Sequence, residues 1–161
     1  MRLYLIGLPG SGKTRIGRKL ASRLSVEFID IDNIIEEKNN SHPSTIIREK
    51  GEDYFRKLET KALKEITVSN AVISTGGGII ERSENKHLMR GKVIYLEINP
   101  DAIKLNHDEI KSRPILEEKG IMKLFIEREC RYLDFSDIII SIDKRSDEEV
   151  IEEVLKKIWK Y

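Results

Sequence analysis

The sequence predicts an α/β fold, in which a five-stranded parallel sheet is covered by helices on both faces and residues 1–161 form a single domain. Short apolar runs rich in β-branched residues alternate with longer segments of helical periodicity, as in successive βαβ units. A glycine-rich segment follows the first of these runs. The length of 161 residues, with 39% hydrophobic and 35% charged residues, suits one globular domain and argues against disorder.

Each expected strand is a short apolar run. The five runs cover residues 3–6, 27–29, 71–74, 92–97 and 137–142. Two longer segments, 13–24 and 53–67, repeat apolar residues at helical spacing and predict amphipathic helices. Ser146 and Glu149 have the spacing of a capping box, so a last helix is expected to start there.

The region after the fourth expected strand is less regular. Asn99 followed by Pro100 predicts the start of a helix, because Asn is a good N-cap and Pro suits the first helical turn. The polar segment 106–120 has no clear periodicity and contains one proline. We therefore expect 106–120 to be a mobile loop that serves as a lid.

Composition narrows the classes of function. The 29 Lys and Arg residues balance 28 Asp and Glu, giving a net charge of +1, so general attraction to nucleic acid or to an anionic membrane is not expected. The longest apolar runs are far shorter than the about 20 residues that span a bilayer. The single cysteine, Cys130, fits a reducing cytosol and is expected to be buried or half-buried. We expect a cytoplasmic monomer with no signal peptide and no membrane span.

The strongest motif is the segment from Gly7 to Thr14, which fits G-x-x-x-x-G-K-[ST]. It lies directly between an expected strand and an expected helix, where backbone N–H groups and the helix N-terminus can hold phosphate oxygens. Lys13 would neutralise the β- and γ-phosphates and Thr14 would hold Mg²⁺. The guanine-specific N-K-x-D motif is missing, because Asn85-Lys86 is followed by His87-Leu88, which argues against a GTPase.

Two further segments suggest a second substrate. Asp30 and Asp32 follow the second expected strand, and their spacing places both carboxylates on one side of an extended segment. One would assist the metal, directly or through water, and the other would orient or deprotonate a hydroxyl; alternatively, an Asp is only a helix N-cap. Residues 76–78 are three glycines that would expose backbone N–H groups to a ligand or form a flexible turn. Glu97 is a competing metal carboxylate.

Several motifs together resemble the shikimate kinase family over nearly the whole chain. Besides the phosphate loop, F-x-D-x-D ends at Asp32, G-E-x-x-F-R ends at Arg56, and the triple glycine ends at Gly78. Arg113-Pro114-Ile115-Leu116 is similar to the lid motif R-P-L-L of the family, and the segment from Arg128 to Tyr132 is similar to its R-x-P-x-Y. The fold implied is that of P-loop kinases related to nucleoside-monophosphate kinases.

The resemblance implies transfer of the ATP γ-phosphate to the 3-hydroxyl of shikimate, a step of aromatic amino-acid biosynthesis through chorismate. The implied catalytic residues are Asp32, as the favoured base, Lys13 and Arg113. The implied shikimate site consists of Asp32, Arg56, Gly77, Gly78 and Arg128. The implied ATP site consists of Gly10, Ser11, Gly12, Lys13, Thr14, Arg15 and Arg113, and Thr14 and Asp30 would serve Mg²⁺. Lys144 or Arg145 would lie near adenine.

Some features leave alternatives open. Cys130 stands where the family motif has proline, and 106–120 is short for a lid. Without the resemblance, Arg56 and Arg128 would be read as surface residues on helical faces. A gluconate or nucleoside-monophosphate kinase, or a nucleotide-binding regulatory module without turnover, remains an alternative to a shikimate kinase.

Overall fold

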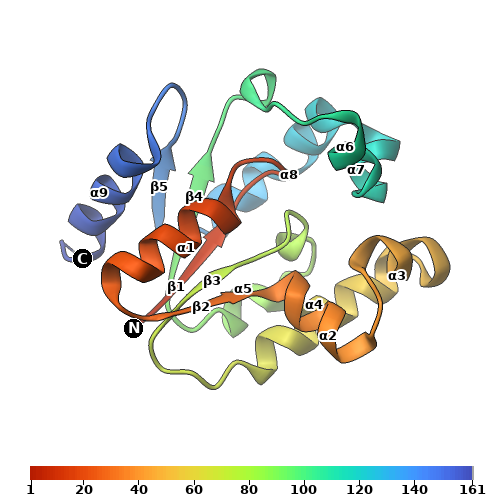
Figure 1. Ribbon diagram of the computed structural model, residues 1–161, viewed down its shortest axis with the longest axis horizontal. Helices are drawn as coiled ribbons and strands as arrows, with labels where there is room; N and C mark the ends of the chain where they lie inside the picture. Colours follow the sequence, from red (N-terminus) through yellow and green to blue (C-terminus); the bar gives the residue numbers. More distant parts are fainter. Residues whose placement is uncertain (161) are drawn as a thin grey trace.

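A five-stranded, all-parallel sheet forms the centre of the molecule, whose computed structural model describes residues 1–160 (Figure 1). The order across the sheet is β2-β3-β1-β4-β5, so the first strand lies in the middle. The strands are β1 (Arg2–Ile6), β2 (Glu27–Asp30), β3 (Ala71–Ser74), β4 (Lys92–Glu97) and β5 (Ile138–Ser141). Their positions agree with the expected runs to within one residue at each end, and the predicted fold class is confirmed.

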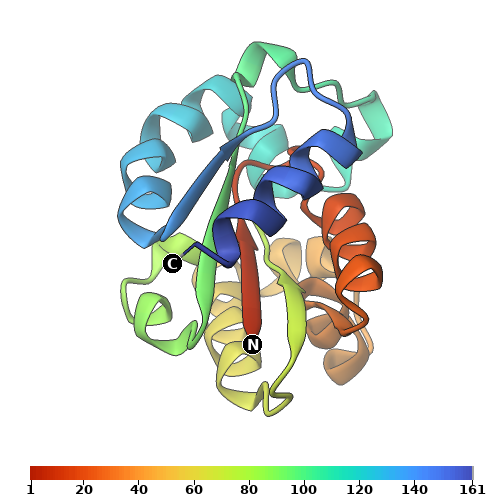
Figure 2. The same cartoon turned by 90° about the vertical axis from the view of Figure 1, so that its left-hand side faces the viewer.

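Side chains alternate between the two faces of the sheet, and each face has its own core. Leu3 and Leu5 of β1 pack on one face with α1 (Lys13–Leu24) and α9 (Asp147–Ile158). Tyr4 and Ile6 point to the other face and join the larger core. Figure 2 shows α9 lying across the first of these faces. The sheet is therefore covered on both sides, as its short and mostly apolar strands require.

The remaining helices pack against the second face or extend beyond it. They are α2 (Ile31–Asn39), α3 (Pro43–Lys50), α4 (Glu52–Glu65), α5 (Glu84–Leu88), α6 (His107–Lys111), α7 (Pro114–Lys119) and α8 (Ile121–Phe135), with 3-10 turns η1 (Ile79–Glu81) and η2 (Pro100–Ala102). In Figure 1, the α2–α4 group and the α6–α7 pair project on the same side of the molecule. Among residues 1–160, none of these helices has the length and apolar character needed to cross a bilayer.

Three local expectations were wrong. Segment 106–120 is not irregular: it forms α6, which begins with a capping box between Asn106 and Glu109, and α7, which has Pro114 in its first turn. The helix expected after Asn99 is only the 3-10 turn η2. Cys130 is exposed, because its position on α8 faces away from the core.

The register of the sheet determines which residues meet at its carboxyl edge. Asp30 at the end of β2 lies opposite Ser74 at the end of β3, and Leu5 of β1 lies opposite Ser74 on its other side. The loop after the central strand therefore stands next to the ends of β2 and β3. In open α/β sheets this edge is where ligands bind.

Candidate active site

The loop between β1 and α1 has the backbone that the phosphate-loop motif requires. Gly10 and Gly12 have φ angles of 81° and 82°, which residues with a Cβ rarely adopt. Gly12 is the N-cap of α1, and no side chain caps the first turn of this helix. The Ser11 N–H donates to the Leu8 carbonyl at 3.1 Å, whereas the N–H groups of Gly10 and Gly12 and the positive end of the α1 dipole are available to an anion.

Lys13 is buried beneath this loop. Its ammonium group donates hydrogen bonds of 2.8 Å to the carbonyl oxygens of Gly7 and Leu8. Burial lowers the pKa of Lys13 to about 7, although the Asp32 carboxylate acts in the opposite direction. Phosphate oxygens next to this group would favour its charged form and raise the pKa again.

Three oxygen-bearing side chains meet beside Lys13. The Thr14 hydroxyl donates to Asp30 Oδ2 at 2.9 Å and lies 3.3 Å from the Ser74 hydroxyl. Hard oxygen ligands of this kind suit Mg²⁺, which also retains waters and binds nucleotide phosphates. The set fits a magnesium ion, although residues 1–160 contain no cluster of three His, Cys, Asp or Glu side chains suited to a metal. Glu97, the competing carboxylate, does not line the cavity described below.

Asp32 lies in the first turn of α2 rather than in an extended segment. The strand ends at Asp30, whose side chain caps α2 by accepting a hydrogen bond from the Asp32 backbone N–H at 3.0 Å. The expectation that Asp30 and Asp32 extend from one strand was therefore wrong, because the chain turns into a helix between them. Asp30 is the N-cap of α2 and also a hydrogen-bond partner of Thr14. The capping role and a role beside the metal therefore both remain open to this residue.

The Asp32 carboxylate is poised to accept a proton. Its Oδ1 atom is buried and has no hydrogen-bond partner among residues 1–160. Burial raises the pKa of Asp32 to about 7, and the carboxylates of Glu59 and Asp30 act in the same direction. A base with this pKa is well matched to proton transfer near neutral pH.

Arg56 and Glu59 form a buried ion pair on α4. Arg56 Nη1 donates to Glu59 Oε2 at 2.7 Å, and Arg56 Nε and Nη2 donate to Glu52 at 3.3 and 3.0 Å. Glu59 is fully buried, and burial raises its pKa even though Arg56 opposes the shift. The Glu59 Oε1 atom, like Asp32 Oδ1, has no partner within the described chain.

Gly78 allows the Arg56 guanidinium to lie against the backbone. A Cβ at position 78 would lie 2.2 Å from Arg56 Cζ, far inside van der Waals contact. The φ of Gly78 is −99°, an ordinary value, so the close approach alone calls for glycine. Gly77, its neighbour, accepts a hydrogen bond of 2.5 Å from the Tyr132 hydroxyl. Side chains from α4 and α8 therefore set the position of the glycine loop.

Arg128 projects from α8 toward the same loop and is almost fully buried, with 3% of its side chain exposed. Its Nε donates to Glu81 Oε1 at 2.8 Å. The expectation that Arg56 and Arg128 are surface residues, which local pattern suggested, was wrong. Both are held inside by carboxylates, because a buried guanidinium needs charged partners.

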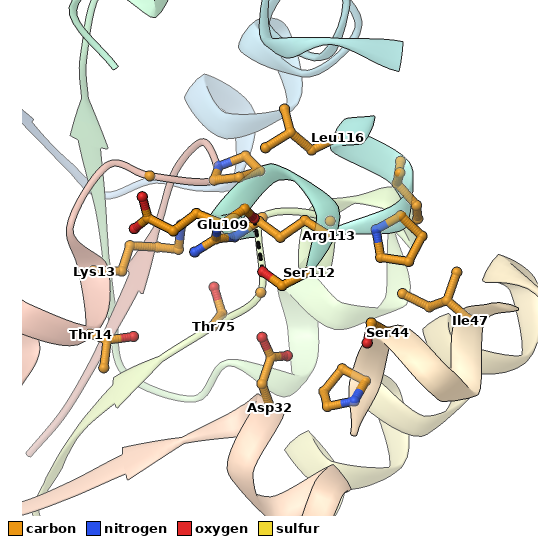
Figure 3. Close-up of a pocket in the computed structure, with 18 of the residues that line it drawn as sticks. Lys13, Thr14, Asp32, Ser44, Ile47, Thr75, Glu109, Ser112, Arg113 and Leu116 are labelled. Carbon is orange, nitrogen blue, oxygen red and sulfur yellow. Dashed lines mark hydrogen bonds between the residues drawn. The ribbon is translucent and has the colours of Figure 1, made fainter. Parts of the chain in front are cut away.

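Arg113 connects α6 and α7 above these groups. Its Nη1 donates to the Glu109 carbonyl at 2.7 Å, and Ser112 Oγ donates to the same carbonyl at 2.8 Å, the bond that is dashed in Figure 3. Arg48 of α3 donates to the Lys111 carbonyl at 2.6 Å and to Glu117 at 3.2 Å. The α6–α7 segment therefore rests on α3.

One cavity of about 580 Å³ unites these features. In Figure 3, Lys13 and Thr14 lie to one side of Asp32, Ser44 and Ile47 lie to the other, and Ser112 and Arg113 lie above it. The cavity brings together most of the residues predicted as site residues: Gly10, Gly12, Lys13, Thr14, Arg15, Asp32, Arg56, Gly77, Gly78, Arg113 and Arg128 line it.

Besides Glu97, four predicted or suggested residues do not line the cavity. Ser11 belongs to the loop but is buried, and the Asp30 carboxylate accepts a hydrogen bond from Thr14. Lys144 is exposed, and Arg145 is bonded to the Ser141 and Glu149 carbonyls and to Glu153. Arg15 does line the cavity, but its Nε and Nη2 donate to Asp147 of α9.

Sequence reasoning missed several residues that build the site. Glu59 and Tyr132 were not assigned roles, although Glu59 stands three positions after Arg56 and Tyr132 four after Arg128, the spacings of neighbours on a helix face. Ser74, whose hydroxyl lies 3.3 Å from that of Thr14, was assigned no role either. Asn85 Oδ1 accepts a hydrogen bond from the Thr60 hydroxyl at 2.8 Å, and Asn85 Nδ2 donates to the Ile79 carbonyl at 2.7 Å. No local pattern in the sequence predicts these contacts.

Comparisons with known proteins agree with this geometry. The family model described as "Shikimate kinase" matches residues 9–159. A shikimate kinase of Sulfurihydrogenibium sp. (strain YO3AOP1) is 38% identical over 163 residues, which cover 97% of this chain and 96% of that protein. The solved structure of the shikimate kinase from Acinetobacter baumannii in complex with shikimate has a TM-score of 0.90 and 33% identity, covering 99% of this chain and 93% of that one.

A more distant likeness extends only to the fold. A gluconokinase from Sinorhizobium meliloti 1021 has a TM-score of 0.63 and 15% identity, covering 99% of this chain and 91% of that one. At this identity the architecture is shared, and nothing is implied about the acceptor. The phosphate loop, the opposing acid and arginines, and a match over nearly the whole length all agree: the chain belongs to the shikimate kinase family.

Proposed function

We propose that this protein is a shikimate kinase that transfers the γ-phosphate of ATP to the 3-hydroxyl of shikimate, giving shikimate 3-phosphate and ADP. The reaction is a step of aromatic amino-acid biosynthesis through chorismate. One observation carries the proposal. A single cavity has a phosphate-binding loop at one side and, at the other, a buried carboxylate oxygen with no partner in residues 1–160, together with two buried arginines.

The phosphate side of the cavity suits ATP. The N–H groups of Gly10 and Gly12 and the start of α1 would hold the phosphates, and Ser11 would join them once its N–H leaves the Leu8 carbonyl. Lys13 would neutralise the charge that develops during transfer. Arg15 would reach the nucleotide on leaving Asp147, to which it is now bonded. For adenine we propose a contact near Lys144 or Arg145; of these, Lys144 is exposed and makes no side-chain hydrogen bond within residues 1–160.

Magnesium would be held by the Thr14 hydroxyl, with Asp30 acting directly or through water. Bound there, Mg²⁺ would neutralise phosphate charge and orient the γ-phosphoryl group. The protein's own contribution is the arrangement of Thr14 between Asp30 and Ser74, which the sheet register enforces.

The acceptor side suits a small hydroxy acid. Asp32 would accept the proton of the 3-hydroxyl as its oxygen attacks the γ-phosphorus and ADP leaves, so no further base is needed. Hydroxyl donors from the substrate would satisfy the buried Asp32 Oδ1 atom. Arg56 and Arg128 would bind the carboxylate, since a guanidinium has a planar set of five N–H donors. Gly77 and Gly78 would contact the ring hydroxyls through the backbone.

The segment 106–120, with α6 and α7, would act as a lid. Arg113 would move from the Glu109 carbonyl to the transferring phosphate as the lid closes, adding positive charge and excluding water. We further propose that the protein works as a cytoplasmic monomer and that its partners are the small molecules ATP and shikimate. The single cysteine and the balanced charge are compatible with this setting.

The proposal is tested by measuring ADP release with Mg²⁺ and ATP, with and without shikimate. We expect strong shikimate dependence in the unmodified protein. Asp32→Asn should lower kcat by about 10²- to 10⁴-fold, the usual contribution of a general base, while ATP binding stays unchanged. Arg128→Ala should raise the KM for shikimate by about 100-fold, since it removes a buried charged partner.

Arg90→Ala is the matched control. Arg90 is exposed and precedes β4, at the amino end of the sheet. This variant removes an arginine without changing the cavity, and its kinetics should equal those of the unmodified protein. If the protein binds ATP but transfers no phosphate to shikimate, only nucleotide binding is supported. Gluconate and nucleoside monophosphates would then be tested as acceptors.

A further inference from the structure

Glu81 connects two arginines of α8, one of which, Arg128, lines the cavity. It ends η1, three residues after Gly78. Its Oε1 accepts the hydrogen bond from Arg128 Nε at 2.8 Å, and its Oε2 accepts one from Arg131 Nη1, also at 2.8 Å. Arg131 Nη1 also donates to the Glu81 carbonyl at 3.3 Å. One carboxylate therefore bridges two guanidinium groups, using both of its oxygens.

This bridge determines which edge of Arg128 faces the cavity. Arg128 Nε donates to Glu81, and the Arg128 side chain also lies within hydrogen-bonding reach of Tyr132, four positions along α8. The guanidinium lines the cavity and is almost fully buried, so it does not rotate freely in solvent. With Nε held by Glu81, the Nη groups are the part of the guanidinium left to bind a carboxylate.

We propose that Glu81 is a positioning residue for substrate binding: by bridging Arg128 and Arg131, it holds the Arg128 guanidinium in the orientation that receives the substrate carboxylate. The inference rests on the proposed function, in which Arg128 binds that carboxylate. It extends the function to a residue that belongs to none of the motifs of the sequence.

Charge explains why a carboxylate is needed at position 81. Arg128 and Arg131 stand three positions apart on α8 and therefore lie on neighbouring parts of the same helix face, where like charges repel. Glu81 lies between them and offsets this repulsion. Its charge is shared by two guanidinium groups, so Glu81, Arg128 and Arg131 together keep a net positive charge that attracts an anionic substrate.

A competing carboxylate makes the orientation of Arg128 important. Glu59 is fully buried, its Oε1 has no partner among residues 1–160, and Arg128 is close enough to lower the pKa of Glu59. Without Glu81, Arg128 would be drawn toward this carboxylate and away from the substrate. Arg56 needs no such bridge from another element, because both of its carboxylate partners, Glu52 and Glu59, lie on its own helix, α4.

The test is the Glu81→Gln variant, which keeps the size and an acceptor oxygen but removes the charge. We expect the KM for shikimate to rise about 5- to 20-fold, less than the roughly 10- to 100-fold expected for complete loss of a hydrogen bond to a charged group, because the variant keeps an acceptor oxygen. The kcat and the KM for ATP should stay within about twofold, because Glu81 touches neither the phosphate loop nor Asp32. Glu81→Asp, which retains the charge, should recover part of the lost affinity.

Glu127→Gln is the matched control. Glu127 precedes Arg128 on the same helix and pairs with Lys119 at 2.8 Å, and its substitution changes the charge near Arg128 by the same amount. It should leave the KM for shikimate unchanged if contact with Arg128, rather than general charge, is what matters. In an Arg128→Ala background, Glu81→Gln should then have no further effect on KM.

The outcomes separate this inference from the proposed function. If the unmodified protein shows no shikimate-dependent turnover, the proposed function fails. If it turns over shikimate but Glu81→Gln has an unchanged or lower KM, or if the effect persists in the Arg128→Ala background, Glu81 does not position Arg128. A lower melting temperature with an unchanged KM would also overturn the inference, since it would show a purely structural role.

Discussion

The two sides of the cavity are built in different ways. The phosphate side comes from consecutive residues, 7–14, whose backbone conformation and position at the start of α1 create the anion site. The acceptor side comes from α2, α4, η1 and α8, and its charged groups lie close together only in the folded chain. Local backbone geometry organises the first, and ion pairs between side chains organise the second.

This difference affects how each side responds to substitution. The phosphate loop holds its ligand through main-chain groups that most side-chain changes leave in place, with Lys13 as the exception. On the acceptor side the arginines and the glycine loop are held by other groups: Arg56 by Glu52 and Glu59, Arg128 by Glu81, and Gly77 by Tyr132. We therefore expect a substitution on the acceptor side to displace the partners of the changed residue as well, and to raise the KM for shikimate.

The largest expected effect is on the phosphate side. Lys13→Ala should lower kcat by about 1,000-fold, the scale found when a preorganised charge-stabilising donor is removed, while shikimate binding measured by calorimetry stays unchanged. Lys19→Ala is the control: it removes a lysine of the same helix that pairs with Asp147 and Glu148 on the surface. A fall in shikimate affinity in Lys13→Ala would show that the two sides are not separable.

An intermediate effect is expected where the acceptor side depends on a close approach. Gly78→Ala would place a methyl group 2.2 Å from Arg56 Cζ and push the guanidinium away. The KM for shikimate should rise about 10- to 100-fold, as for loss of a buried charged contact, with the KM for ATP unchanged. Gly120→Ala tests backbone strain without a side-chain collision, because a Cβ there meets nothing within 4 Å in residues 1–160 but its φ of 77° is one that residues with a Cβ rarely adopt. Equal kinetics for Gly78→Ala and the unmodified protein would contradict the packing argument.

The smallest expected effect concerns pH. Because the pKa of Asp32 is about 7, kcat/KM for shikimate should fall about tenfold for each pH unit below that value, and this acid limb should be absent from the residual activity of Asp32→Asn. A limb that persists in Asp32→Asn would assign the titration to another group. The profile needs only steady-state kinetics between pH 5 and 9.

The same shift should appear in stability, with a defined sign. The pKa of Asp32 in the folded protein lies above its ordinary value of 3.8, so its contribution to stability is present below about pH 4 and is lost as the pH rises through 7. Asp32→Asn should therefore raise the free energy of unfolding by about 1–3 kcal/mol at pH 8 and change it little at pH 4. Urea titrations at the two pH values measure this difference.

Local patterns predicted much of the framework. The helix expected at 13–24 has those bounds in the structure, and Ser146 and Glu149 form the expected capping box. Asn106 and Glu109 have the same capping-box spacing, but no helix was expected after them, because α6 and α7 are too short to show helical periodicity. The placement of Asp32 was wrong because capping by Asp30 ends the strand, and alternation along a strand does not continue into a helix.

What the sequence by itself determined is the alternation of strands and helices and the phosphate loop, since both arise from interactions among residues close along the chain. Only the tertiary structure decided that Arg56 and Arg128 are buried, that Asp32 and Glu59 each keep an unpartnered oxygen, and that Glu81 joins Arg128 to Arg131. The physical reason is that the energy of a buried charge depends on which distant groups share its low-dielectric surroundings. Sheet order and helix packing set those neighbours, and no local window of sequence contains them.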